Sequence, residues 1–171
     1  MKRLVFLAII AVSFFAPSYA QKFALVDMEY ILKNIPAYEM ANEQLNQVSQ
    51  RWQKEVETKR SEVETQYNNY KSDMVFLTDD QKSKREQEIV DLEKEATELS
   101  YKYFGPQGEL YQKRQSLIQP IQDDIYNAIK KLSEEKGYQA IFDRASSQSI
   151  ILASPKSDVR NEVLAKLGYS K

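Results

Sequence analysis

Histidine and cysteine are both absent from this chain, and glycine and proline are scarce, with four and five residues in 171. The chain therefore lacks the commonest general base, the thiolate nucleophile and the usual zinc ligands. It also contains no glycine-rich phosphate loop and no G-x-S-x-G motif. We expect a protein that is not an enzyme and that holds no metal or cofactor.

The charge balance points away from nucleic acid as a partner. Charged residues make up 29% of the chain and are interleaved in sign, which is typical of solvated helix faces. Without the N-terminal Lys2 and Arg3, 22 basic residues stand against 25 acidic ones. A net charge of this sign gives no electrostatic basis for binding DNA or RNA.

The first twenty residues have the pattern of a cleaved export signal. Lys2 and Arg3 precede an apolar stretch, residues 4–15, and Ser18-Tyr19-Ala20 is a small-x-small cleavage site. We expect cleavage after Ala20, so that residues 1–20 are removed and the mature, exported chain begins at Gln21. Because an exported protein without cysteine has no disulfides, its stability must come from packing or oligomerisation.

A long helix is predicted from Glu39 to Leu77, a stretch without glycine or proline. Its apolar residues recur mostly at intervals of three and four, the mark of a coiled-coil seam, with a stutter after Trp52. They are Leu45, Val48, Trp52, Val56, Val63, Tyr67, Tyr70, Met74 and Leu77.

A tip follows at residues 77–80, and a second helix starts there. Thr78 is a good N-cap and Gln81 its capping-box partner. The apolar seam of the second helix runs from Ile89 to Tyr103, is interrupted at residues 105–108 (GPQG), and resumes from Leu110 to Leu132. Gly137 is expected to end it.

The two helices match each other as an antiparallel hairpin that turns between Leu77 and Thr78, although two seven-residue repeats also match in shifted registers. In such a hairpin, facing residues have numbers that add up to 155. The pairs that satisfy this rule are Leu45 with Leu110, Trp52 with Tyr103, Val56 with Leu99, Val63 with Leu92 and Tyr38 with Leu117. The glycine-proline break faces the stutter, so the segment is either an irregularity filled by aromatic side chains, which could act as a hinge, or a simple loop. If Gly105 to Gly108 is a hinge, changing Gly105 and Pro106 to alanine should reduce the mobility of the hairpin.

Short β-like segments lie near both ends of the mature chain. They are residues 23–27 (FALVD), 138–143 (YQAIFD) and 149–153 (SIILA), and a final helix is expected over Asp158–Leu167 with Ser157 as its cap. Three short strands make a weak sheet, so we expect oligomerisation through it. The residues chosen for the core of the oligomer, from alternate strand positions, are Phe23, Leu25, Ile141, Ile150 and Leu152.

The predicted fold class is α+β, mainly α: a long antiparallel coiled-coil hairpin arm, residues 38–117, that projects from a small β body which oligomerises. The body is discontinuous and comprises residues 21–37 and 118–171. Replacing Ile141 or Ile150 by aspartate should abolish assembly.

The chain resembles the Skp/OmpH-like periplasmic chaperones over its entire mature length. The resemblance is carried by residues 23–38 (FALVDMEYILKNIPAY) and 117–143, and most specifically by Pro120, Ile121, Ile125, Ala128, Ile129, Gly137, Tyr138, Ile141, Phe142 and Asp143. It implies a homotrimer with a central β body and three helical arms around a cavity. Such proteins keep unfolded outer-membrane proteins soluble without ATP.

Candidate client-binding residues lie at the arm tip. Met74, Val75, Phe76 and Leu77 are more consecutive apolar residues than one helix seam can bury, although they could equally close the end of the hairpin. Tyr101 and Tyr111 lie off the seam and are further candidates. The basic clusters at residues 82–85 and 113–114 could contact lipid, lipopolysaccharide or acidic proteins, but interleaved acidic residues favour a solvated face.

A second hypothesis gives the same hairpin a different function. A structural envelope adaptor would use a coiled-coil hairpin to dock one fixed partner, and its seam should be fully sealed. A chaperone should instead expose apolar surface and bind several unfolded proteins loosely. The surplus of apolar residues at the tip favours the chaperone.

Overall fold

The structure is a computed structural model that describes residues 21–147 and 150–169. The expected export signal, residues 1–20, lies outside the described residues. The elements are β1 (Phe23–Val26), α2 (Met28–Lys33), α3 (Pro36–Asp73), the 3-10 helix η1 (Met74–Phe76), α4 (Asp79–Phe104), α5 (Glu109–Lys136), β2 (Ala140–Asp143), the 3-10 helix η2 (Pro155–Ser157) and α6 (Arg160–Lys166). The expectation of a mainly helical α+β chain with long helices and a small sheet is confirmed.

The described residues divide into two compact units. One, called the hairpin unit below, comprises Ile31–Asn127. The other, called the body unit, comprises residues up to Tyr30 and those from Ala128 onwards. α2 and α5 each contribute to both units, because the division falls inside these helices.

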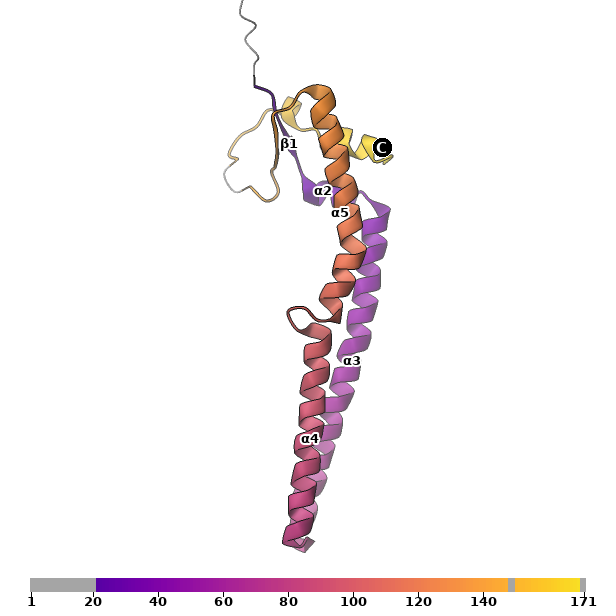
Figure 1. Ribbon diagram of the computed structural model, residues 1–171, viewed down its shortest axis with the longest axis vertical. Coiled ribbons are helices and arrows are strands. Elements are labelled where there is room, and N and C mark those ends of the chain that lie inside the picture. The colour runs from indigo at the N-terminus through magenta and orange to yellow at the C-terminus, as the bar shows by residue number, and fades with distance from the viewer. Residues whose placement is uncertain (1–20, 148–149, 170–171) are drawn as a thin grey trace, which may run out of the picture. The chain divides into compact units, whose positions relative to one another are not determined.

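In the hairpin unit, α3 and α4 run side by side in opposite directions (Figure 1). α3 begins at Pro36, three residues before the predicted start at Glu39. Proline suits the first helical turn because the amide hydrogen that it lacks would have no partner there. The helix then continues for 38 residues, and its buried side chains are Ala41, Leu45, Trp52, Val56 and Tyr70.

The turn between α3 and α4 is closed as predicted. Thr78 and Gln81 form a reciprocal capping box, in which the Gln81 amide donates to the Thr78 hydroxyl at 3.4 Å and the Thr78 amide donates to Gln81 Oε1 at 2.9 Å. Asp79 and Asp80 occupy the first turn of α4, where carboxylates stabilise the helix N-terminus.

The break between α4 and α5 is a tight turn over residues 105–108, which bulges to the side of the helix pair in Figure 1. The Gly105 amide donates to the Tyr101 carbonyl at 2.7 Å, and the Gly108 amide to the Gly105 carbonyl at 2.9 Å. A Cβ atom at Gly105 would lie 2.5 Å from the Tyr101 carbonyl oxygen. Glycine is therefore required by the close approach of the backbone.

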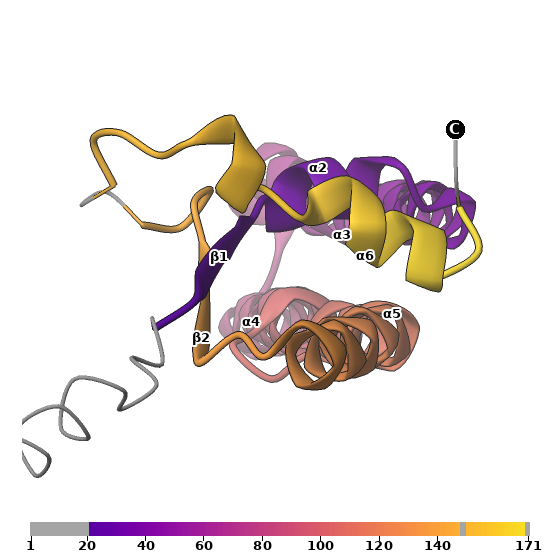
Figure 2. The ribbon, with the colours of Figure 1, turned by 90° about the horizontal axis from the view of Figure 1, so that it is seen from above.

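In the body unit, β1 and β2 form a parallel pair with Phe23 opposite Ala140 and Val26 opposite Asp143 (Figure 2). On its other edge, β1 is bridged to Asp158, and the Val159 amide donates to the Leu25 carbonyl at 2.9 Å. Both edges of this short strand are thus in use.

The prediction of a third strand at residues 149–153 is wrong for residues 150–153. Residues 150–153 have no regular structure, and Ser149 lies outside the described residues. A strand forms where a neighbouring strand supplies partners for its backbone hydrogen bonds. Asp158, and not this segment, is bridged to the edge of β1 that β2 leaves open.

The last helix is shorter than predicted. α6 begins at Arg160, and Ser157 lies in η2 instead of capping it. Asp158 is held in the bridge to β1, so it cannot enter the helix, and its carboxylate accepts a hydrogen bond from the Arg160 amide at 3.1 Å. Gly137 and Gly168 have φ values of 70° and 85° and end α5 and α6, as predicted for Gly137.

Ion pairs and hydrogen bonds tie the body unit together. The Asp143 carboxylate accepts hydrogen bonds from the amides of Met28 and Ala145, both at 3.1 Å. The Arg160 guanidinium lies 4.3 Å from the centre of the Tyr30 ring and pairs with Asp27 and Asp158. In the described part of the chain, no helix combines the length and apolar character needed to cross a membrane.

Candidate functional site

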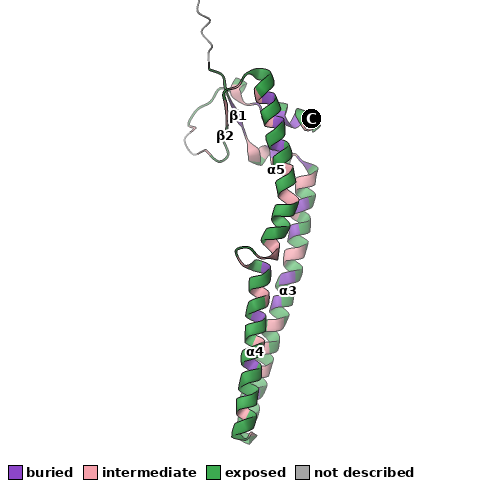
Figure 3. Ribbon diagram, viewed as in Figure 1, coloured by how far each residue is buried: buried purple, intermediate pink, exposed green. Residues whose placement is uncertain are grey.

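The tip of the hairpin unit carries exposed apolar side chains. Val75 and Phe76 are 75% and 85% exposed, Met74 is exposed, and Leu77 is half-buried. Three of these residues form the single turn of η1, and consecutive residues of a helical turn point in different directions. One seam cannot cover them all, and the end of the hairpin is accordingly exposed (Figure 3).

The charges around this tip are mixed in sign. Lys71, Lys84 and Arg85 are exposed, and the Lys82 ammonium pairs with the Asp79 carboxylate at 3.4 Å. Exposed pairs of this kind contribute little to stability. The tip therefore offers apolar contact area without a strong field of one sign.

Tyr70 closes the seam beneath the tip. Its side chain is buried, and its hydroxyl donates a hydrogen bond to the Glu86 carboxylate on α4. This hydrogen bond, together with burial of the ring, raises the pKa of Tyr70 above the ordinary value of 10.0. Because Tyr70 already bridges the two helices, Val75 and Phe76 are not needed to close the hairpin.

A second seam cluster lies beside the turn at residues 105–108. The buried residues Trp52, Val56 and Tyr103 form it, with Val48, Leu99 and Leu110 packed around them. The rings of Trp52 and Tyr103 are stacked with their centroids 4.7 Å apart, which confirms this predicted pair. Burial, and the hydrogen bond that its hydroxyl donates to Glu55 at 3.0 Å, raise the pKa of Tyr103.

Tyr101 and Tyr111 lie on either side of the same turn. Tyr101, in the last turn of α4, is 70% exposed and lies against the Gly105 backbone. Tyr111, near the start of α5, is exposed, and its hydroxyl accepts a hydrogen bond from Gln115 at 2.9 Å. Both rings are accessible for contact with another molecule.

The five residues predicted for the core of the oligomer differ in exposure. Leu25 is buried within its own chain, Ile141 and Ile150 are half-buried, and Phe23 and Leu152 are exposed. Leu25 lies inside β1, between β2 on one edge and the bridge to Asp158 on the other. An apolar hollow of about 610 Å³ lies beside it, with Phe23, Ile150 and Leu152 in its lining.

Two exposed apolar residues of the body unit were missed in the sequence. Phe142 lies with its ring 6.2 Å from that of Phe23, and Ile151 is 99% exposed. The strand alternation that selected Ile141 and Ile150 assigned Phe142 and Ile151 to the opposite face. The signal that could have found Ile151 is the uninterrupted apolar run at residues 150–153, which no alternating strand would hide on one side.

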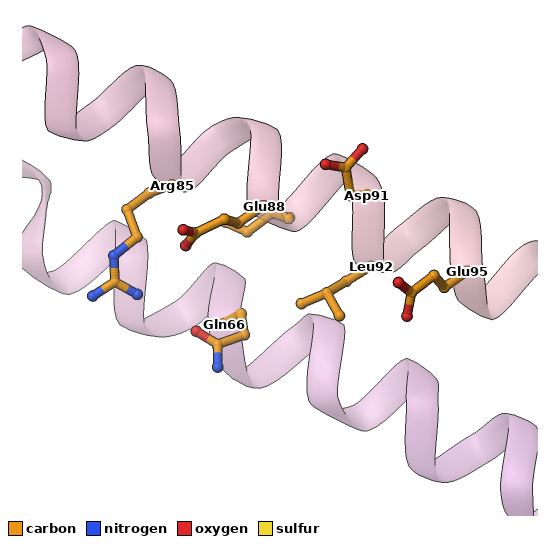
Figure 4. A pocket seen from close by; sticks show the side chains of 7 residues that line it. Gln66, Arg85, Glu88, Asp91, Leu92 and Glu95 are labelled. Carbon is orange, nitrogen blue, oxygen red and sulfur yellow. The ribbon is translucent and has the colours of Figure 1, made fainter.

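Grooves flank the seam of the hairpin in the stretch between Tyr70 and the cluster around Trp52 and Tyr103. One, of about 410 Å³, is lined by Gln66 of α3 and by Arg85, Glu88, Leu92 and Glu95 of α4, among others (Figure 4). Another, of about 470 Å³, has Val63, Tyr67 and Ala96 in its lining. Among residues 21–147 and 150–169, no three acidic side chains converge as metal ligands would.

Comparisons with known proteins agree with this architecture. Residues 22–167 match the family described as outer membrane protein (OmpH-like). A crystal structure of a candidate outer membrane chaperone (OmpH-like) from Caulobacter crescentus CB15 superposes with a TM-score of 0.68, covering 89% of this chain and 86% of the other. At 12% sequence identity this is a likeness of fold. No curated protein matches the chain.

Proposed function

This chain belongs to the family of OmpH-like outer membrane proteins, and on that premise we propose that it is a holding chaperone of the periplasm. It binds unfolded outer-membrane proteins between helical arms and prevents their aggregation without ATP. Residues 1–20 direct its export and are removed after Ala20. The chaperone named in the solved structure of the same fold supports this function.

The observation that carries the proposal is the exposed tip. Val75 and Phe76 present apolar area to solvent although Tyr70 already closes the seam. Adjoining exposed apolar residues, unlike single scattered ones, often mark an interaction site. Weak apolar contacts at several arm tips would hold an unfolded chain by avidity, with Tyr101 and Tyr111 as further contact points.

We further propose that the chain acts as a homotrimer assembled through the body unit. Phe23, Phe142, Ile151 and Leu152 are exposed apolar residues of that unit and form the proposed contact surface. Leu25 is buried within its own chain and supports this surface from below. Ile141 and Ile150 are half-buried, so part of each side chain belongs to the surface. A trimer places three hairpins around one cavity. This arrangement allows several weak contacts with one client at the same time.

The test is an aggregation assay with an unfolded outer-membrane β-barrel. The double variant Val75→Ser with Phe76→Ser should remain folded and assembled but suppress aggregation at least several-fold less well than the unchanged protein. The matched control is Met40→Ser with Val90→Ser, which removes two exposed apolar side chains elsewhere on the hairpin unit. This control should retain full activity.

Equal activity of the tip variant and the unchanged protein would refute the tip as client contact. Capture of envelope proteins by the purified chain separates the chaperone from the adaptor. A chaperone should retain several unrelated unfolded proteins weakly, whereas tight retention of one folded protein would favour the adaptor.

A further inference from the structure

The seam of the hairpin is underfilled over one continuous stretch. On α3, the buried residues Val56 and Tyr70 are separated by thirteen positions, all of them described and none of them buried. On α4, the stretch opposite contributes Ile89 and the small Ala96 as its buried residues. We define the middle interval as residues 57–69 of α3 and the facing residues 87–98 of α4.

Polar side chains take two of the half-buried seam positions of α3 in the middle interval, on either side of Val63. Lys59 is half-exposed, and its ammonium pairs with Glu62 at 3.3 Å and with Glu95 of α4 at 3.6 Å. Gln66 lines one groove instead of filling a core position, while Tyr67, which the sequence placed in the seam, is half exposed. Half-buried polar groups contribute far less to helix association than apolar residues at the same positions.

Two grooves accompany this lack of buried apolar side chains in the middle interval. The groove of about 410 Å³ follows the edge of α4 from Arg85 to Glu95, and the groove of about 470 Å³ follows the edge from Glu93 to Thr97. Figure 4 shows Gln66 and Leu92 facing one of these spaces from the two helices. These grooves are open to solvent, so water reaches the seam and little apolar area is buried between the two helices here.

Both helices of the interval also contain residues that favour bending. The hydroxyls of Thr58 and Thr65 donate to the carbonyls four residues earlier on α3, each at 2.8 Å. Thr97 does the same on α4 at 2.9 Å. Such hydrogen bonds compete with the helix ladder and often bend a helix.

Strong contacts bound the interval on both sides. On one side lie the Trp52–Tyr103 stack and Val56, and on the other Tyr70 bonded to Glu86. The stack also lies beside the turn at residues 105–108 and braces it, because α3 passes that level without a break. The flexible point of the hairpin is therefore expected between the two clusters instead of at the turn.

We propose that the hairpin bends and transiently opens in the middle interval, so that the tip moves as a rigid piece bounded by Tyr70 and Glu86. Local opening is easiest where the buried apolar contact is least. This property belongs to the hairpin itself and does not depend on the proposed chaperone function.

Residue-resolved amide hydrogen exchange of the purified full chain, without any client, tests the proposal. Amides of residues 59–66 should exchange about tenfold faster than those of residues 50–56 and 70–73. The variant Lys59→Leu with Gln66→Leu fills the seam, and it should slow exchange of residues 59–66 by about tenfold.

The matched control is Glu57→Leu with Asn68→Leu, which adds the same two side chains at exposed positions of α3. It should leave the exchange rates unchanged. Uniform protection along α3 of the unchanged chain would overturn the proposal, and so would equal slowing by the seam and control variants. Since no client is present, failure here is distinguishable from failure of the proposed function.

Discussion

The indole of Trp52 on α3 stacks on the ring of Tyr103 on α4, with an angle of 6° between the planes. Both side chains are buried, and the Tyr103 hydroxyl reaches Glu55 at 3.0 Å. A two-helix hairpin has little core elsewhere, so this stack fixes the register of α3 against α4. Aromatic contacts of this geometry add to the stabilisation that burial of the rings provides.

Trp52→Ala should strongly destabilise the hairpin, because it empties the centre of its largest buried cluster. The expected loss is about 3 kcal/mol in the free energy of unfolding. Denaturant unfolding followed by circular dichroism measures it. Trp52→Phe keeps most of the apolar volume and should lose much less. Equal, small losses for both variants would show that the stack does not hold the helices together.

The hairpin should lose stability at alkaline pH through Tyr70 and Tyr103. The pKa of each phenol is raised in the folded chain, so folding favours the protonated form. Their contribution is complete below the ordinary value of 10.0 and is lost as the pH rises through the raised pKa. Absorbance titration should find two tyrosines ionising late, and Tyr70→Phe with Tyr103→Phe should remove both. If all tyrosines of the unchanged protein ionise together, the prediction fails.

Asp143 should make the body unit sensitive to acid. Partial burial acts to raise its pKa, but the hydrogen bonds from the Met28 amide, from Ser146 and from the Ala145 amide outweigh it and lower the pKa below 3.8. The carboxylate therefore stabilises the fold above its ordinary pKa, and this contribution is lost as the pH falls through the lowered value. Thermal unfolding of Asp143→Asn should show a lower melting temperature at neutral pH and a weaker decline in acid. A parallel decline in both proteins would contradict this assignment.

Thr78→Ala should weaken the start of α4, because it removes the hydroxyl that accepts from the Gln81 amide. Loss of such a cap costs about 1 kcal/mol. Thr78→Ser retains the hydroxyl and should behave like the unchanged protein. Amide exchange of residues 79–82 gives the most direct readout, and unchanged exchange in the alanine variant would show that the capping box does not stabilise this end.

Leu152→Asp should abolish assembly, since it places a charge on the exposed apolar surface proposed for trimerisation. Leu152 makes a cleaner test than Ile141, because aspartate at the half-buried Ile141 would also disturb the fold of its own chain. Sedimentation velocity should find monomers for Leu152→Asp and trimers for Val90→Asp, a matched change on the hairpin unit. Trimers that persist in the Leu152 variant would exclude this surface.

Several helix positions and ends could be predicted from the sequence because their causes are local. The capping box of Thr78 and Gln81, the glycine at position 137 and the break at residues 105–108 depend on neighbouring residues alone. The pairing of Trp52 with Tyr103 also followed, since a tight turn of known position fixes the register of a hairpin.

The exposure of the apolar residues was decided by the tertiary structure. Phe23 and Leu25 have the same alternation in sequence, yet only Leu25 is buried, because Phe23 is the first residue of the strand whereas Leu25 lies within it, beside the bridge to Asp158. Gln66 and Tyr67 each line a groove, and Tyr67 is half exposed although the sequence placed it in the seam, because the seam drifts around a helix whose period differs from that of the heptad. Local propensity specifies an element, whereas burial depends on partners that the sequence brings together only in the folded chain.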